Sequence, residues 1–300
     1  MITYSSLGTA GNLGNQMFQI ASVIGLAKKH GHDYFFPQWN YAEVFNGTFP
    51  VGQRDSSFKL LKETRFDYHQ WPIGDGNYDI SGWLQTEKYF DVDFTKKLFS
   101  FNDALVSQTL DKARHLFGKP TVLISVRRGD FIRNPGAYQL SYKYYFLAIQ
   151  EHFADSQTYN LLFTSDDIGY CKRHFSFLPN ARFIEGFTPI EQLIIARNCD
   201  HFIISNSTFS WWAAWLGEKA GSKIIRPLKS MRGKAALKFN DKDYFPGRWI
   251  VFAHEGKNAG LRHWKLFLKG ETEEVYDTVR IFLKDTKLQL KKKLKKLIGR

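Results

Sequence analysis

The chain of 300 residues has only two cysteines, Cys171 and Cys199. Two cysteines are too few for the disulfide framework of a small secreted protein, and a zinc site would need histidines close by. The sequence also lacks an apolar run of the roughly 18–20 residues that span a bilayer. Met1–Leu7 is too short for the apolar part of a signal peptide and has no leading positive charge. We therefore expect a cytoplasmic protein with two buried thiols.

Acidic residues are fewer than basic ones, and the difference is unevenly distributed. The chain has 29 Asp and Glu against 42 Lys and Arg, a formal net charge of +13. Residues 284–300 alone hold eight of the basic residues and one acid, Asp285. A non-catalytic nucleic-acid binder is one explanation of a basic chain with 16% aromatic residues. We disfavour it and expect no nucleic-acid partner, because the excess lies mainly in a tail that also carries leucines.

Short apolar runs alternate with helical patterns over the second half of the chain, which predicts an α/β fold with a doubly wound, parallel, Rossmann-like sheet. In this half, the expected strands are 121–126, 160–164, 182–184, 201–204 and 223–226, and the expected helices are 141–154, 167–175, 189–198 and 208–219. In the first half, the expected strands are 2–7, 33–36 and 78–84, and the expected helices are 15–30, with Gly31 as its C-terminal stop, and 102–117.

Polar clusters follow three of these strands at their carboxyl ends, where ligands bind in such sheets. They are Arg127–Asp130, Ser165–Asp167 and Ser205–Thr208. Arginine suits phosphate, and the last cluster opens a helix whose free N–H groups suit an anion. Consecutive side chains of an extended segment point in opposite directions, so we expect one arginine to face a ligand and the other to pair inward with Asp130.

Other sequence patterns argue against common cofactors. The loop Gly8–Gly14 matches neither the dinucleotide fingerprint nor the phosphate-binding loop of nucleotide hydrolases. Asp91–Asp93 and Asp241–Asp243 both read Asp-X-Asp, a pattern that holds a divalent ion in some nucleotide-sugar enzymes, but neither follows a convincing buried strand. Because the paired arginines can neutralise a diphosphate, we expect neither metal nor cofactor.

Four motifs in order resemble those of the family 11 glycosyltransferases, the α-1,2-fucosyltransferases. They are Gly11–Gln19 (GNLGNQMFQ), Val126–Phe131 (VRRGDF), Phe163–Asp167 (FTSDD) and Ile204–Leu216 (ISNSTFSWWAAWL). The resemblance implies a two-lobed GT-B-like architecture and metal-independent, inverting transfer of fucose from GDP-fucose to a galactose-terminated glycan. Bacterial members often extend lipid-linked, O-antigen-like surface glycans, which makes a lipid-linked acceptor one candidate.

The resemblance also implies roles for individual residues. Arg127 resembles the arginine that grips the β-phosphate of the donor, and Asn15 aligns with an asparagine that faces the reaction centre. Asp130 is a candidate catalytic base, with two alternatives left open: it braces the arginines, or the leaving diphosphate accepts the proton. The expected donor-binding residues are Gly14, Gln16, Ser125, Arg128, Asp166, Asp167, Asn206, Ser207 and Thr208.

One position departs from the family pattern. The family usually has histidine where this chain has Ser125, and that histidine is associated with the nucleotide. The alternative that stays open is therefore transfer from another GDP-sugar or related donor.

The tail has a pattern of its own. From about residue 271 the sequence predicts one long basic helix, typical of a segment that lies on anionic lipid. Its apolar residues are Val275, Val279, Phe282, Leu283, Leu290, Leu294, Leu297 and Ile298. A solvated basic tail is the alternative; with membrane contact through 284–300, the protein is expected at the inner face of the bacterial cytoplasmic membrane. The expected divisions are an acceptor-side lobe (1–117), a nucleotide-sugar lobe (118–228), a peripheral region (229–270) and the helical tail (271–300).

Overall fold

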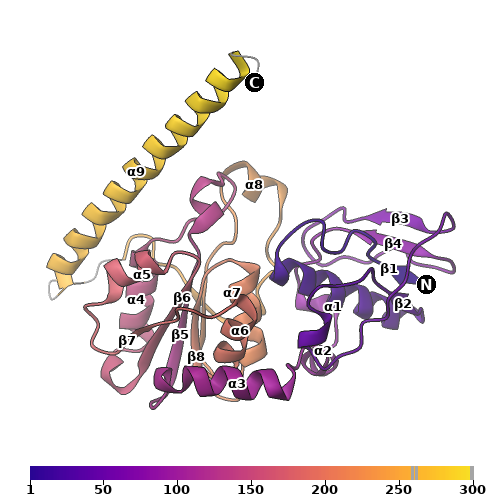
Figure 1. Cartoon of the computed structure of the whole chain (residues 1–300), viewed down its shortest axis with the longest axis horizontal. Helices are drawn as coiled ribbons and strands as arrows, with labels where there is room; N and C mark the ends of the chain where they lie inside the picture. Colours follow the sequence, from indigo (N-terminus) through magenta and orange to yellow (C-terminus); the bar gives the residue numbers. More distant parts are fainter. Residues whose placement is uncertain (258–259, 261–262, 298–300) are drawn as a thin grey trace.

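The computed structural model describes residues 1–257, 260 and 263–297, and it contains two parallel sheets covered by helices (Figure 1). The first sheet has the order β2-β1-β4-β3. Its strands are β1 (Ile2–Thr3), β2 (Tyr34–Phe35), β3 (Lys59–Lys62) and β4 (Tyr78–Ser81). Three of them lie inside or beside predicted strands, although they are shorter, whereas β3 was not predicted.

Helix α1 (Leu13–His30) carries the first motif and begins two residues earlier than predicted. It is buried on nearly every side, and Gly31 ends it in the left-handed conformation, with φ of 71°, that favours glycine. The other helices of this half are α2 (Val92–Leu98), α3 (Asp103–Ala113) and the 3-10 turns η1 (Ala42–Val44), η2 (Glu87–Tyr89) and η3 (Arg114–Leu116).

The second sheet is the predicted doubly wound one, with the order β10-β9-β8-β5-β6-β7 and all pairings parallel. Its strands are β5 (Thr121–Val126), β6 (Asn160–Ser165), β7 (Ala181–Phe183), β8 (His201–Ile204), β9 (Ile224–Pro227) and β10 (Ile250–Phe252). The helices of this half are α4 (Tyr142–His152), α5 (Ile168–Phe175), α6 (Pro189–Arg197), α7 (Thr208–Gly217), α8 (Gly233–Lys238) and the 3-10 turns η4 (Gly129–Arg133) and η5 (Ser156–Thr158).

Successive residues of the central strands enter two different cores, as the strand period of two requires. Leu123 and Leu162 belong to the core that contains α6, α7 and α1, while Ile124 and Phe163 belong to the core that contains α4 and α5. The second sheet is therefore covered on both faces. Strand β10, the sixth strand, was not predicted.

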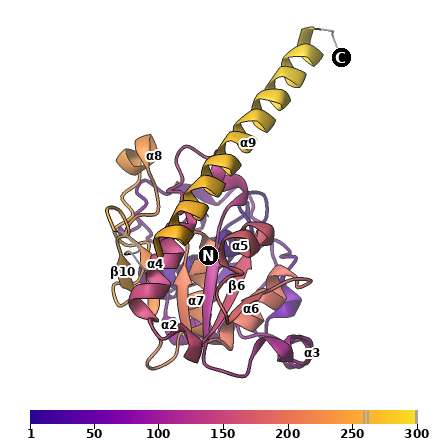
Figure 2. The same cartoon turned by 90° about the vertical axis from the view of Figure 1, so that its left-hand side faces the viewer.

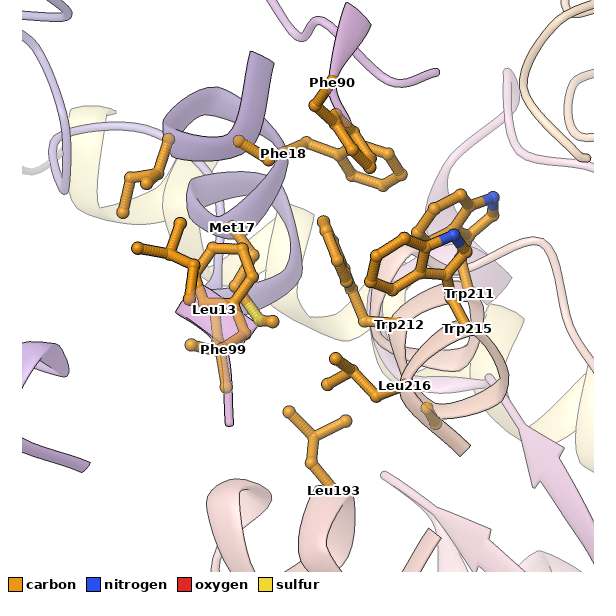
Figure 3. Packing of buried hydrophobic residues seen from close by; sticks show 14 of the residues in the cluster. Leu13, Met17, Phe18, Phe90, Phe99, Leu193, Trp211, Trp212, Trp215 and Leu216 are labelled. Atoms are coloured by element: carbon orange, nitrogen blue, oxygen red, sulfur yellow. The ribbon is translucent and has the colours of Figure 1, made fainter. Parts of the chain in front are cut away.

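The two halves of the molecule meet through aromatic side chains (Figure 3). The ring of Phe18 on α1 lies 4.5 Å from that of Trp211 and 5.0 Å from that of Trp212, both on α7. Trp212 also donates a hydrogen bond of 2.9 Å to the carbonyl of Gly14. The tryptophan-rich motif therefore holds α1 against α7, and it does so close to the start of α1.

Helix α9 (Trp264–Leu297) forms the tail, and its far end extends beyond the rest of the molecule (Figures 1 and 2). Its first turns pack closely on α4, because a Cβ atom on Gly270 would lie 2.4 Å from the ring of Tyr142. The carboxylate of Glu274 accepts hydrogen bonds from the Tyr142 N–H (3.0 Å) and the Tyr170 hydroxyl (2.5 Å). Several apolar residues beyond this anchor are exposed: Val275, Val279, Phe282, Leu283, Leu290 and Leu294.

The helix begins seven residues before the predicted start of the tail, while the predicted stripe residue Ile298 and the basic residue Arg300 lie outside the described residues. Within the described part of the chain, no helix is both long and apolar enough to cross a membrane. Both cysteines are buried free thiols, as predicted. Burial raises the pKa of the Cys171 thiol to about 12, so it is unreactive at neutral pH.

Candidate functional site

A cavity of about 900 Å³ lies between the two halves and takes residues from both. The polar clusters at the ends of β5, β6 and β8 meet there, as predicted, together with the loop before α1. Ten of the twelve predicted site residues line it: Gly14, Asn15, Gln16, Ser125, Arg127, Asp130, Asp166, Asn206, Ser207 and Thr208. Arg128 and Asp167 are not part of its lining.

The starts of α1 and α7 lie against each other at the cavity. A Cβ atom on Gly14 would lie 2.7 Å from the carbonyl carbon of Thr208 and 2.8 Å from the nitrogen of Phe209. Neither helix has an acidic residue in its first turn, and Asn12 at the start of α1 makes no side-chain cap hydrogen bond. Two positive helix ends therefore face one cavity, an arrangement that favours an anion.

Arg127 is the only arginine or lysine that lines the cavity within the part of the chain that the structure describes. Its guanidinium forms ion pairs with Asp130 and, at 3.0 Å, with Asp166. Two carboxylates therefore hold the Arg127 side chain. It still reaches the cavity, because 22% of its surface stays exposed.

Asp166 holds the arginine loop in place. One carboxylate oxygen accepts a 2.8 Å hydrogen bond from the Arg128 N–H, while the other contacts Arg127. A Cβ atom on Gly129 would lie 2.3 Å from that second oxygen, so only glycine leaves room for the carboxylate. Asp166 thus lines the cavity with both oxygens already engaged by the loop, and its expected role in donor binding stays a prediction.

Arg128 points away from the cavity. Its guanidinium carbon lies 4.0 Å from the centre of the Tyr170 ring, a stacking arrangement suited to arginine. The expectation that the inward arginine pairs with Asp130 is wrong: Asp130 forms its ion pair with Arg127, three residues before it. Asp167 caps α5, where its carboxylate accepts a 2.9 Å hydrogen bond from the Tyr170 N–H.

Ser125, which stands where the family usually has histidine, lies buried at the end of β5. Its hydroxyl is 2.7 Å from that of Ser210, which is also 2.7 Å from that of Ser205. The three hydroxyls form a chain across the neighbouring strand ends and the first turn of α7. Ser125 therefore offers a small polar surface to the cavity rather than an imidazole.

Two predicted amide residues build the walls. Gln16 donates to the Gly11 carbonyl (3.0 Å) and accepts from the Trp39 indole (2.8 Å). Asn206 donates to the carbonyls of Tyr138 (3.0 Å) and Ser230 (2.5 Å). In these arrangements the amides shape the cavity, and Ser207 caps α7 by accepting from the Phe209 N–H at 3.2 Å.

Residues 82–85 contribute to the cavity without having been predicted. Trp83 and Gln85 both line it, and Gln85 donates a 2.7 Å hydrogen bond to the side chain of Asn15. This part of the sequence has no regular period. The only feature of the sequence that could have pointed to Trp83 and Gln85 is the predicted strand 78–84, because they lie near its end.

Three of the four aspartates in the Asp-X-Asp patterns have structural contacts. Asp91 caps α2 by accepting from the Phe94 N–H at 2.7 Å. Asp241 accepts from the N–H (2.7 Å) and the hydroxyl (2.6 Å) of Ser230, and Asp243 pairs with Lys88 at 2.5 Å. In the described ranges, no group of three His, Cys, Asp or Glu residues is placed to hold a metal ion.

Comparison with known proteins gives one family. The model of glycosyl transferase family 11 matches residues 4–252. An alpha-1,2-colitosyltransferase of Escherichia coli is 30% identical over 287 residues, which cover 80% of this chain and 96% of that protein. The O-antigen biosynthesis glycosyltransferase WbnK of Escherichia coli is 30% identical over 47% of this chain and 50% of its own length. The galactoside 2-alpha-L-fucosyltransferase SEC1 of Bos taurus is 24% identical over 83% of this chain and 73% of its own.

Solved structures of two fucosyltransferases share the fold. NodZ alpha-1,6-fucosyltransferase soaked with GDP-fucose superposes with a TM-score of 0.50 at 11% identity, covering 72% of this chain and 91% of its own. POFUT1 in complex with GDP-fucose superposes with a TM-score of 0.51 at 13% identity, covering 74% and 96%. The predicted α/β, two-lobed GT-B-like architecture is confirmed.

Proposed function

Because the chain belongs to glycosyl transferase family 11, we propose that it transfers fucose from GDP-fucose to the 2-hydroxyl of a galactose-terminated glycan. The observation that carries this proposal is the cavity shared by the two halves, where Arg127 and the starts of α1 and α7 converge. A diphosphate fits that convergence, because it carries negative charge and accepts N–H donors.

The reaction is a displacement with inversion. The acceptor oxygen forms a bond to the anomeric carbon of fucose while the bond from that carbon to the β-phosphate oxygen breaks, and GDP leaves from the opposite face. Negative charge grows on the β-phosphate during this step. Arg127 and the helix starts are already in position to stabilise that charge, so they need not reorganise as it forms. The acceptor proton goes to Asp130 or to the leaving diphosphate.

We propose that the reaction needs no metal ion. Arg127 and two helix starts provide positive charge for the diphosphate, and three of the four Asp-X-Asp carboxylates, those of Asp91, Asp241 and Asp243, are engaged in structural contacts. The test is transfer to lactose, followed by mass spectrometry, with and without EDTA. Equal rates support the proposal, whereas loss of activity in EDTA and its return with Mg²⁺ or Mn²⁺ contradict it.

Nucleotide choice is tested by binding alone. GDP should raise the melting temperature of the protein, and UDP at the same concentration should not. A protein that is stabilised by UDP but not by GDP would contradict the proposed donor even before any transfer is measured.

A second donor is favoured by one relative. The Escherichia coli protein that is 30% identical is an alpha-1,2-colitosyltransferase, and colitose is fucose without its 3-hydroxyl. Ser125, with its small hydroxyl in place of an imidazole, is a further reason to test the donor. A competition experiment decides between the two donors. GDP-fucose and GDP-colitose are supplied together in equal amounts to a limiting amount of acceptor, and the ratio of the two products gives the ratio of kcat/KM for the two donors.

We further propose that the acceptor is a lipid-linked, O-antigen-like glycan and that residues 284–300 bind an anionic membrane. The support is the match to WbnK and the exposed apolar side chains of Phe282, Leu290 and Leu294 on a lysine-rich helix. Full-length protein should sediment with vesicles that contain phosphatidylglycerol, and a chain ending at residue 283 should not. If the full-length protein stays in the supernatant, the membrane contact is refuted.

A further inference from the structure

Trp83 is an unusually open aromatic residue for the wall of a cavity. It lines the cavity and keeps 40% of its surface exposed, while the next residue, Leu84, is fully buried. Exposed tryptophan in a concave site offers a flat apolar face that a ligand can cover. It belongs to the first half of the chain, whereas Arg127 belongs to the second.

The backbone around Trp83 is held by a carboxylate. Glu63, which follows β3, accepts hydrogen bonds from the N–H groups of Trp83 (2.7 Å) and Leu84 (3.0 Å). A Cβ atom on Gly82 would lie 2.4 Å from the Cβ of Glu63, so the two segments touch without space between them. The hydroxyl of Tyr4 donates to the Gly82 carbonyl at 2.8 Å.

Leu84 adopts a backbone conformation that a leucine rarely adopts. Its φ is 57°, the left-handed region, and its carbonyl accepts a 3.0 Å hydrogen bond from Ser22 on α1. This conformation places Leu84 in the core while Trp83 and Gln85 on either side both line the cavity. Strain of this kind persists only where the surroundings hold it, and it is commonly found at functional sites.

The hydrogen-bonding groups beside Trp83 suit a sugar. The side chains of Gln85 and Asn15 are joined by a 2.7 Å hydrogen bond and both line the cavity. A galactose ring has one face formed largely by C–H groups and a rim of hydroxyls, so it can cover an indole while it bonds to amides.

From this arrangement, and resting on the proposed function, we propose that Trp83 is the platform on which the terminal galactose of the acceptor stacks. Glu63 is a positioning residue, because it is not part of the cavity lining and holds the platform by accepting two backbone hydrogen bonds. The donor and the acceptor are thus bound by opposite halves of the chain.

The test compares Trp83→Ala and Trp83→Phe with the matched control Trp264→Ala, since Trp264 is also exposed but lies outside the cavity lining. Transfer kinetics are measured with the concentrations of lactose and of GDP-fucose varied in turn. Trp83→Ala should raise the KM for lactose about tenfold or more, which corresponds to about 1.4 kcal/mol, and leave the KM for GDP-fucose within about twofold. Trp83→Phe should recover part of the loss, and Trp264→Ala should match the wild type.

Glu63→Gln tests the positioning role. It offers only one acceptor oxygen to the two N–H groups, so the KM for lactose should rise while kcat and the stabilisation by GDP stay close to wild type. A Glu63→Gln protein that loses GDP stabilisation to the same degree as lactose affinity has a general folding defect, and that result overturns the positioning role.

Saturation-transfer NMR of lactose with GDP-saturated protein separates this inference from the proposed function, because it needs no transfer. Signals from the galactose ring that vanish in Trp83→Ala support the platform, even if the wild type fails to use GDP-fucose. Normal transfer by the wild type with unchanged lactose signals in Trp83→Ala overturns the platform and leaves the proposed function intact. Wild-type protein that gives neither transfer nor lactose signals overturns both.

Discussion

Gly14 and Thr208 lie in contact although 194 positions of the chain separate them, and a Cβ atom on Gly14 would come within 2.8 Å of the Thr208 hydroxyl oxygen. The contact joins the first turn of α1 to the first turn of α7. It brings the positive ends of two helices to one cavity, and it depends on the absence of a single side-chain atom.

Gly14→Ala tests this contact. The added methyl group meets backbone atoms of Thr208 and Phe209, so the two helices must separate, and overpacking of this kind costs about 1–3 kcal/mol. We expect a lower free energy of unfolding in urea and a smaller stabilisation by GDP. Gly247→Ala is the control, because a Cβ atom there meets nothing within 4 Å. Equal behaviour of the two variants would contradict the importance of the contact.

Arg127→Ala should abolish useful turnover. Loss of one preorganised donor to a developing charge lowers kcat by about 10²–10³, and no other arginine or lysine lines the cavity among the described residues. The kcat of Arg127→Lys should lie between those of Arg127→Ala and the wild type, because lysine keeps the positive charge but lacks the planar guanidinium. The measurement is kcat at saturating donor, with circular dichroism to show that the fold is retained. Arg114→Ala, on an exposed ion pair outside the cavity, serves as control.

Asp130→Asn separates two roles of that carboxylate. A catalytic base predicts that the acidic limb of the pH–rate profile disappears while GDP binding stays normal. A brace for Arg127 predicts weaker GDP binding with the acidic limb retained. We expect the second result, because Asp130 already forms an ion pair with Arg127. Loss of the limb with unchanged GDP binding would instead establish Asp130 as the base.

Because of Glu63, we expect the free energy of unfolding to depend on pH in a specific way. Burial raises the pKa of its carboxyl from 4.5 to about 7. Between pH 4.5 and pH 7, the carboxyl is therefore protonated in the folded state and ionised in the unfolded state. Its contribution is present below pH 4.5 and disappears as the pH rises through 7. The two tyrosines that face it, Tyr4 and Tyr89, stay neutral in this range because burial raises both of their pKa values.

The comparison of Glu63→Gln with wild type isolates this effect. The free energy of unfolding of the variant, relative to wild type, should increase between pH 5 and pH 8, by about 3 kcal/mol at most, since a tenfold change in an ionisation constant corresponds to about 1.4 kcal/mol. Urea titrations at four pH values give the comparison. A difference that stays constant with pH would show that Glu63 has an ordinary pKa.

The parts of the fold that could be predicted are those where local pattern and burial agree. Strand β5 is a nearly continuous apolar run because both faces of its sheet are covered. The end of this run could therefore be located in the sequence, and Arg127 and Arg128 follow it directly. Strand β3 was missed because it begins and ends with lysine and is largely exposed. Strand β10 was missed because only one of its three residues is buried.

The same difference applies to the site. Arg127 and Asp166 follow buried strands, so their meeting at one sheet edge followed from topology. Trp83 is placed by the hydrogen bond that its N–H donates to Glu63, twenty positions away, and by the one that the still more distant Tyr4 donates to the neighbouring Gly82 carbonyl. No local pattern records contacts of that kind. The pairing of Asp130 was wrong for a similar reason, since the ring that takes Arg128 belongs to α5.

The anchor of α9 joins the tail to the half of the chain that carries Arg127. Glu274 bonds to Tyr170, and Tyr170 stacks on Arg128, the neighbour of Arg127. A helix of 34 residues is about 50 Å long. A surface bound by its far turns would therefore hold the cavity at a set height and angle, and an acceptor anchored in that surface would be chosen by its length as well as by its terminal sugar.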